Sequence, residues 1–156
     1  MSDVSTIVRG NVVATAIFVV SSSLAALVFE GAWKVQGVVV SLGLFTIGIA
    51  AFLWGYWTAV QRSREVEMSV AELYFLMGDA TPRRIKRIML GCLTVQVVAA
   101  LVTAIVRPST PAAGGGSTTG STLAFGVLVP VLGLGLNGLW AARAGEFPAR
   151  RRAEDA

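Results

Sequence analysis

Residues 35–57 read VQGVVVSLGLFTIGIAAFLWGYW, a run of 23 residues without an Asp, Glu, Lys, Arg or His. A helix of that length rises about 35 Å, which is enough to cross a hydrocarbon core of roughly 30 Å. Three further uncharged runs of 18 to 20 residues lie at 12–29, 88–106 and 123–142. The sequence therefore predicts an all-α, polytopic membrane protein with four transmembrane helices in an antiparallel bundle.

The composition supports one membrane domain without a separate soluble module. Hydrophobic residues make up 54% of the 156 residues, charged residues make up 14%, and the mean hydropathy is +0.71. Soluble domains carry about 25% charged residues, and the segments between the runs are too short to bury a core of their own. We expect a transmembrane domain (12–142) with an inner loop (61–87), an outer loop (107–122), an N-terminal segment (1–11) and a basic tail (143–156).

Basic residues are concentrated on one side of the predicted membrane. Eleven of the thirteen Lys and Arg residues lie in the N-terminal segment, the inner loop and the tail, whereas only Lys34 and Arg107 lie on the other side. The positive-inside rule then places both termini in the cytoplasm of a multi-pass protein of the cell inner (plasma) membrane. Aromatic residues, which favour membrane interfaces, lie near the ends of the runs at Trp33, Trp54, Tyr56, Trp57 and Trp140.

The inner loop contains the signature of a short helix. Ser69 and Glu72 have the spacing of a capping box, and Gly78 is a candidate C-terminal stop, so we expect a helix over 70–77. Its apolar residues fall near one face. This pattern favours a short interfacial helix in the inner headgroup layer or against the bundle, rather than a site for a docking partner.

A basic cluster opens the third predicted span. Thr81 is expected to be the N-cap and Pro82 the first helical residue. The cations that follow oppose the helix dipole, so helix stability does not explain them. They serve either as a plain topology signal or as a contact for anionic lipids. The cluster consists of Arg83, Arg84, Lys86 and Arg87.

The chain has few groups suited to catalysis or to coupled transport. No span holds a carboxylate and the protein has no His, which disfavours proton coupling. Cys92 is the only cysteine and is expected to be a buried structural residue. We predict no catalytic, cofactor or metal site and no nucleic-acid partner. A lipid-modifying enzyme using inner-loop carboxylates is a third hypothesis, but a solvated charged surface explains Glu65, Glu67, Glu72 and Asp79 more simply.

Gly133, Gly135 and Gly138 match the spacing GxGxxG, but they lie within an apolar run rather than between a strand and a helix. In a membrane helix such glycines allow another backbone to approach closely, and we interpret them as helix-packing residues. The pairs Ser21 with Ala25 and Gly37 with Ser41 have the same character. Pro130, near the middle of the fourth run, is expected to bend its helix.

Uncharged polar residues at depth are the remaining candidates for function. Ser22, Gln96 and Asn137 are predicted to meet in an intramembrane polar network. Hydrogen bonding between helices is one role for such residues, and lining a path for a solute is the other. The packing role is the simpler interpretation.

The outer loop is rich in Pro, Gly, Ser and Thr and has no apolar periodicity. We expect a flexible tether without regular structure over 107–122. Its Ser and Thr residues would also suit O-glycosylation.

Four segments carry a family resemblance: TPRRIKR at 81–87, the third uncharged run at 88–106, the apolar run that ends at Trp140, and ARAGEFP at 142–148. Together with the preference for Arg over Lys, they resemble small uncharacterised four-helix integral membrane proteins of actinobacteria. The resemblance covers residues 81–148 and implies a cell-envelope setting.

Two functional hypotheses stand ahead of the lipid-modifying enzyme. The first is a small non-enzymatic membrane protein, an accessory or assembly subunit that contacts a membrane-protein partner or a second copy of itself within the lipid bilayer. The alternative is an oligomeric channel or uncoupled small-solute carrier. Such a channel must be oligomeric because four helices seldom enclose a pore alone.

Overall fold

The computed structural model describes residues 2–28, 31–106, 109–112, 116–119 and 122–150. Predictions that involve Arg107, Arg151, Arg152 and the remaining parts of the outer loop and tail lie outside these residues. The elements are α1 (Ser2–Val28), α2 (Gly31–Arg62), α3 (Val70–Tyr74), α4 (Arg83–Val106), β1 (Ser109–Ala112), β2 (Gly116–Thr119), the 3₁₀ helix η1 (Thr122–Leu128) and α5 (Pro130–Ala144).

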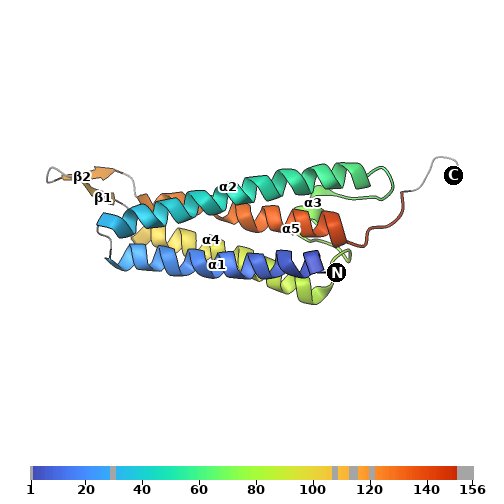
Figure 1. Cartoon of the computed structure of the whole chain (residues 1–156), viewed down its shortest axis with the longest axis horizontal. Helices are drawn as coiled ribbons and strands as arrows, with labels where there is room; N and C mark the ends of the chain where they lie inside the picture. Colours follow the sequence, from blue (N-terminus) through green and yellow to red (C-terminus); the bar gives the residue numbers. More distant parts are fainter. Residues whose placement is uncertain (1, 29–30, 107–108, 113–115, 120–121, 151–156) are drawn as a thin grey trace.

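Figure 1 shows α1, α2, α4 and α5 side by side along one long axis, with consecutive members running in opposite directions. Helical segments long and apolar enough to cross a membrane are Val4–Val28, Gly31–Arg62, Arg83–Val106 and Leu123–Ala144. α5 packs chiefly against α2, and α1 packs chiefly against α4. Each predicted run therefore corresponds to one long helical segment, and the most extensive contact is the one between α2 and α5.

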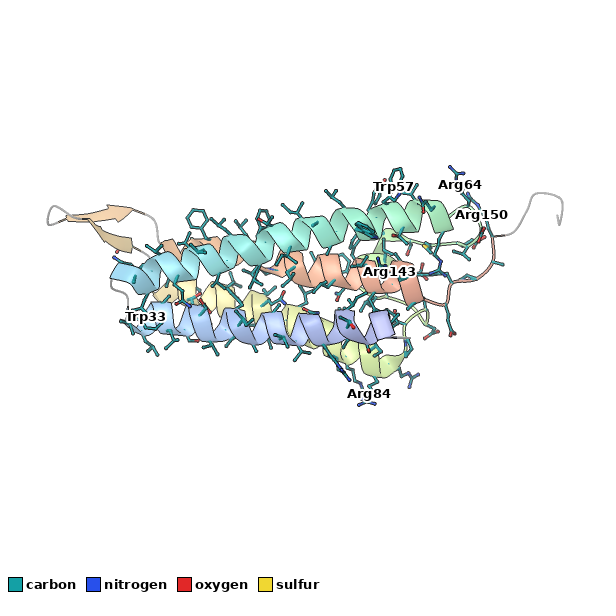
Figure 2. The ribbon with its side chains drawn as sticks, in the orientation of Figure 1. Trp33, Trp57, Arg64, Arg84, Arg143 and Arg150 are labelled. Carbon is teal, nitrogen blue, oxygen red and sulfur yellow. The ribbon has the colours of Figure 1, made fainter. Side chains whose placement is uncertain are left out.

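The two ends of the molecule differ in charge. Arg64, Arg84, Arg143 and Arg150 lie together at the end that we call the basic end, whereas Trp33 lies at the opposite end (Figure 2). The β1–β2 hairpin projects from the Trp33 end (Figure 1). Apart from Lys34, which is next to Trp33 in the sequence, the described cations thus gather toward one end of the molecule.

α1 begins ten residues before the first uncharged run, because Ser2–Val28 forms one helix. The segment that we expected to precede the helix is therefore part of it over residues 2–11. Buried positions recur along α1 at spacings of three or four residues, which places them on one face. These positions include Ile7, Asn11, Thr15, Phe18, Ser22 and Ala25.

The last span is divided at Pro130 into a 3₁₀ segment and an α-helix. A 3₁₀ segment ends at Leu128, and α5 begins with Pro130 as its first residue. Proline has no N–H and its ring obstructs the carbonyl four residues earlier, but it fits the first position of a helix well. The Val129 N–H donates to the carbonyl of Gly126 at 3.0 Å, a three-residue spacing. Pro130 therefore marks the junction between the 3₁₀ segment and α5 instead of lying inside one regular α-helix.

The outer loop contains regular structure that we did not expect. β1 and β2 pair as antiparallel strands, with Thr110 opposite Thr118 and Ala112 opposite Gly116. Threonine, a β-branched residue that favours extended backbone, occupies one paired position in both strands. The prediction of a tether without regular structure is wrong for these two segments.

The capping box of the inner loop is confirmed. The Glu72 N–H donates to Ser69 Oγ at 3.1 Å, and the Ser69 N–H donates to the Glu72 carboxylate at 3.0 Å. However, α3 ends at Tyr74, so Gly78 is not its stop. The chain turns at Leu76, which has a left-handed φ of 50° and a fully buried side chain. Burial of Leu76 in the core ends the helix despite the unfavourable φ.

Two smaller predictions are also wrong. The Thr81 hydroxyl is buried without a hydrogen-bond partner among the described residues, so it does not cap α4, which begins at Arg83. Trp140 is only 3% exposed and lies in the core cluster with Leu73 and Met89 instead of at an interface. Its position on α5 turns the indole toward the other helices.

Candidate functional site

The most polar contact inside the bundle joins α4 to α1. The side-chain amide of Gln96, which is 0% exposed, donates to Asn11 Oδ1 at 3.2 Å and to Thr15 Oγ1 at 2.7 Å. The Thr15 hydroxyl in turn donates to the backbone carbonyl of Asn11 at 2.7 Å. Asn11 and Thr15 are one turn apart on α1, so both face the same glutamine. The amide of Gln96 therefore ties two helices together.

A second polar contact joins α5 to α3 at the basic end. The side-chain amide of Asn137 donates to the backbone carbonyl of Tyr74 at 3.1 Å. The Tyr74 hydroxyl donates to the carbonyl of Phe52 at 3.3 Å, and the two rings stack with centroids 4.3 Å apart. Burial raises the pKa of Tyr74 above its ordinary value of 10.0, and the nearby Tyr56 adds to this shift. Tyr74 is therefore neutral at physiological pH and acts as a hydrogen-bond donor.

The structure separates the three members of the predicted polar network. Gln96 and Asn137 donate to different elements, and Ser22 donates to the carbonyl of Val19 on its own helix at 3.2 Å. Within the described part of the chain, the amide oxygens of Gln96 and Asn137 have no hydrogen-bond donor. Each residue thus uses its donor to hold helices together and keeps an unsatisfied acceptor.

Sequence reasoning did not identify Asn11, Thr15 or Tyr74 as parts of these contacts. Asn11 lies one residue before the apolar run that begins at Val12, so it was not counted among the residues of the first span. However, α1 begins at Ser2 and includes Asn11. The spacing of four residues between Asn11 and Thr15 was the available signal, since it places both on one helix face. No comparable signal pointed to the backbone carbonyl of Tyr74.

The three glycines of α5 lie against three different neighbours. A Cβ at Gly133 would lie 2.7 Å from Gln96 Oε1, and a Cβ at Gly135 would meet the carbonyl oxygen of Gly48 on α2. Gly138 lies directly under the ring of Tyr74. Each glycine thus leaves room for a group of another element.

The basic residues at the start of α4 do not act as one group. The Lys86 ammonium donates to the carbonyl of Gly78 at 3.3 Å, whereas Arg83, Arg84 and Arg87 are exposed. The side chain of Arg84 projects away from the helices at the basic end (Figure 2). Only part of the predicted anionic-lipid contact is therefore free to face outward.

Arg62 has a role that the sequence did not indicate. Its guanidinium donates to the carbonyl of Ala142 at 2.7 Å and to that of Gly145 at 3.1 Å, and it lies 5.9 Å from the centroid of the Phe147 ring. The last carbonyls of a helix have no partner within the helix and carry partial negative charge. Arg62 of α2 therefore caps the C-terminus of α5.

The tail is joined to the inner loop by backbone pairing. Val66 and Ala149 form an antiparallel bridge. The Glu67 N–H donates to the backbone carbonyl of Pro148 at 2.9 Å, and the Arg150 N–H donates to the backbone carbonyl of Glu65 at 2.9 Å. The basic end is consequently an ordered surface over the described residues up to 150.

Other candidate chemistry is sparse in the part of the chain that the structure describes. No group of three or more His, Cys, Asp or Glu side chains there is arranged to hold a metal ion. Cys92 is buried and is a free thiol. The polar groups that gather inside the bundle among the described residues are mainly amides and hydroxyls, which form hydrogen bonds.

The sequence matches no protein-family model, no curated protein and no solved structure.

Proposed function

We propose that this chain is a small, non-enzymatic membrane subunit that assembles with a membrane-protein partner in the plasma membrane of the cell envelope. The observation that carries the proposal is the use made of Gln96 and Asn137. Both residues were candidates to line a solute path. Both are fully buried, and both donate hydrogen bonds to other elements of the chain.

This arrangement favours a structural role for the intramembrane amides. Hydrogen bonds between membrane helices contribute about 0.6 to 2 kcal/mol each. A side chain that serves as such a tie is restrained in position, whereas a path for a solute needs polar groups that release one partner for another. The same geometry offers less support to the oligomeric channel or uncoupled carrier.

The membrane placement is part of the proposal. The four long helices span the bilayer as an antiparallel bundle, with the basic end and both termini on the cytoplasmic side. The exposed aromatic rings of Trp54 and Trp57 near this end suit the lipid interface. α3 and the turn that follows it lie at the same interface and present the exposed apolar side chains of Val70, Phe75 and Met77 to the headgroup layer.

The outward faces of α2 and α4 are the surfaces available to a partner. In the most apolar 18-residue stretch of α2 and in that of α4, 28% of the residues are buried. The corresponding share for the last span is 50%. The last span is therefore the central helix, and α2 and α4 lie outermost. A partner that packs on either helix leaves the internal contacts intact.

The test is gentle extraction of a tagged full-length chain from native membranes, followed by native mass spectrometry and identification of whatever copurifies. A partner at fixed stoichiometry supports the proposal, whereas isolation as a free monomer contradicts it. A homo-oligomer that conducts solutes in proteoliposomes supports the channel instead.

A double variant separates the two functional hypotheses further. In Gln96→Leu with Asn137→Leu, loss of both ties is expected to weaken the fold and, through it, partner binding. If the double variant folds normally but loses a measured solute flux, the packing role is wrong and the path-lining role is correct. Thr94→Val is the matched control, because Thr94 is exposed and its hydroxyl donates to the carbonyl of Leu90 on its own helix, with no bond to another described helix.

A further inference from the structure

A groove of about 610 Å³ lies at the basic end, between the first turns of α1 and α4 and the last turns of α5. This volume falls within the range of roughly 300–1,000 Å³ that is typical of small-molecule sites. Much of the lining is apolar and comes from Val4 and Val8 of α1 and from Ile85 and Ile88 of α4. Such a surface suits hydrocarbon.

Two arginines from different helices also line this groove. Arg9 belongs to α1 and Arg84 to α4, and both are exposed. Neither guanidinium has an ion-pair partner among the described residues, and none of the residues that line the groove is acidic. Two guanidinium groups at one groove without an acidic neighbour in its lining attract an anion, and the fork geometry of a guanidinium matches the oxygens of a phosphate group.

Trp140 of α5 also lines the groove. Its indole N–H is buried and has no hydrogen-bond partner in the described part of the chain. An unpaired buried donor is unfavourable, so this side chain still has a hydrogen bond to offer to an acceptor.

We infer that the groove between α1, α4 and α5 binds one anionic phospholipid, with its phosphate between Arg9 and Arg84 and its glycerol and first acyl carbons against the apolar lining. A phospholipid fits because it combines one anionic head with apolar chains, and the groove combines two cations with an apolar wall. The volume accommodates the head and the start of the chains, which continue into the bilayer. The inference rests on the membrane placement proposed above.

The site selects one member of the basic cluster. Arg84 lines the groove, Arg83 and Arg87 do not, and Lys86 is bonded to Gly78. Arg83 and Arg87 therefore provide a matched control, because they carry the same charge on the same helical turns as Arg84.

The experiment places the full chain in nanodiscs that contain phosphatidylglycerol and phosphatidylcholine, and native mass spectrometry counts the lipids retained after mild delipidation. The wild type is expected to retain one phosphatidylglycerol in preference to phosphatidylcholine. Each guanidinium contributes about fivefold in affinity, so Arg9→Gln with Arg84→Gln should weaken retention about 25-fold. The control, Arg83→Gln with Arg87→Gln, should change retention by less than about threefold at physiological ionic strength, because exposed charges outside the site are screened.

Three results would overturn the inference. Equal losses in the two double variants would show diffuse attraction to a basic surface instead of a site. Equal retention of phosphatidylcholine and phosphatidylglycerol by the wild type would show that the arginines select no head group. Failure of the chain to insert into a bilayer would overturn the membrane placement and this inference together, whereas insertion without lipid preference overturns the inference alone.

Discussion

The contact between α2 and α5 and the contact between α1 and α4 hold their helices together in opposite ways. Between α2 and α5 the backbones themselves meet, since a Cβ at Gly48 would lie 2.6 Å from the backbone nitrogen of Leu132. Between α1 and α4 the Gln96 amide reaches across to Thr15 at 2.7 Å. One contact depends on the absence of side chains and the other on two complementary side chains.

The difference matters because a bilayer supplies no hydrophobic driving force between helices. Close packing and interhelical hydrogen bonds are the two main sources of association that remain. A backbone contact uses the whole length of the interface and cannot accommodate an added methyl group. A side-chain contact is local, so its loss has a limited cost. The two pairs should therefore respond differently to substitution.

The largest expected effect is at Gly48. In Gly48→Ala the new methyl group would overlap the backbone of Leu132, which cannot move aside as a flexible side chain can, so α2 and α5 must separate. We expect a loss of about 2 to 3 kcal/mol in the free energy of unfolding. Reversible unfolding in mixed detergent micelles provides the measurement.

Gly43→Ala is the matched control for this prediction. Nothing lies within 4 Å of a Cβ at Gly43, which is on the same helix. Alanine favours helix over glycine, so this variant should be neutral or more stable by up to about 1 kcal/mol. Equal losses in the two variants would show that the backbone contact is not what holds α2 to α5.

The next effect tests the polar pair. Gln96→Leu removes both donors to α1 and should cost about 1 to 2 kcal/mol in the free energy of unfolding. A double-mutant cycle with Thr15→Val isolates the coupling between the two side chains. A coupling energy of zero would remove the hydrogen bond as a source of stability, and Thr94→Val again serves as the control.

A smaller effect is expected at the C-terminus of α5. Arg62→Gln removes the charged cap on the carbonyls of Ala142 and Gly145, and we expect a loss of about 1 kcal/mol. Arg64→Gln is the matched control, because Arg64 is exposed and has no hydrogen bond or ion pair within the described residues. If both variants lose the same stability, net charge at the basic end explains the effect better than capping.

The smallest effect concerns alkaline pH. The pKa of Tyr74 is raised in the folded state, so the unfolded state releases its proton first and stability falls once the pH rises above about 10.0. Half a pH unit above that value, the loss relative to neutral pH should be less than about 0.9 kcal/mol. Comparing the pH dependence of unfolding in the wild type and Tyr74→Phe measures it, and identical profiles would contradict the assignment.

Much of the fold could be predicted from the sequence, because in each span the signal is long and local. An uncharged run such as 35–57 leaves the backbone no alternative to a helix within a bilayer, since unpaired N–H and C=O groups are too unfavourable there. The Ser69–Glu72 capping box is likewise local. The errors arose where a neighbour decides the outcome, as at Leu76, whose burial ends α3 early.

The candidate site was harder to predict, because hydrogen-bond partners depend on the rotation of each helix. The sequence indicated that Gln96 and Asn137 are polar groups at depth, but both bond to elements that the sequence could not align with them. The role of Arg62 was hidden for the same reason. In the sequence, Arg62 is one of several basic residues near the inner loop, and only the position of α5 beside it shows that its guanidinium caps that helix.

The sequence by itself determined the number of long apolar helices, the charge difference between their ends and the start of the short inner-loop helix. These properties follow from residue type and spacing along the chain. Tertiary structure alone decided which helices pair, which glycines meet a backbone, and that Arg9 and Arg84 line one groove. Those outcomes depend on how whole helices rotate and pack, because a side chain becomes a partner or a binding group only through its neighbours in space.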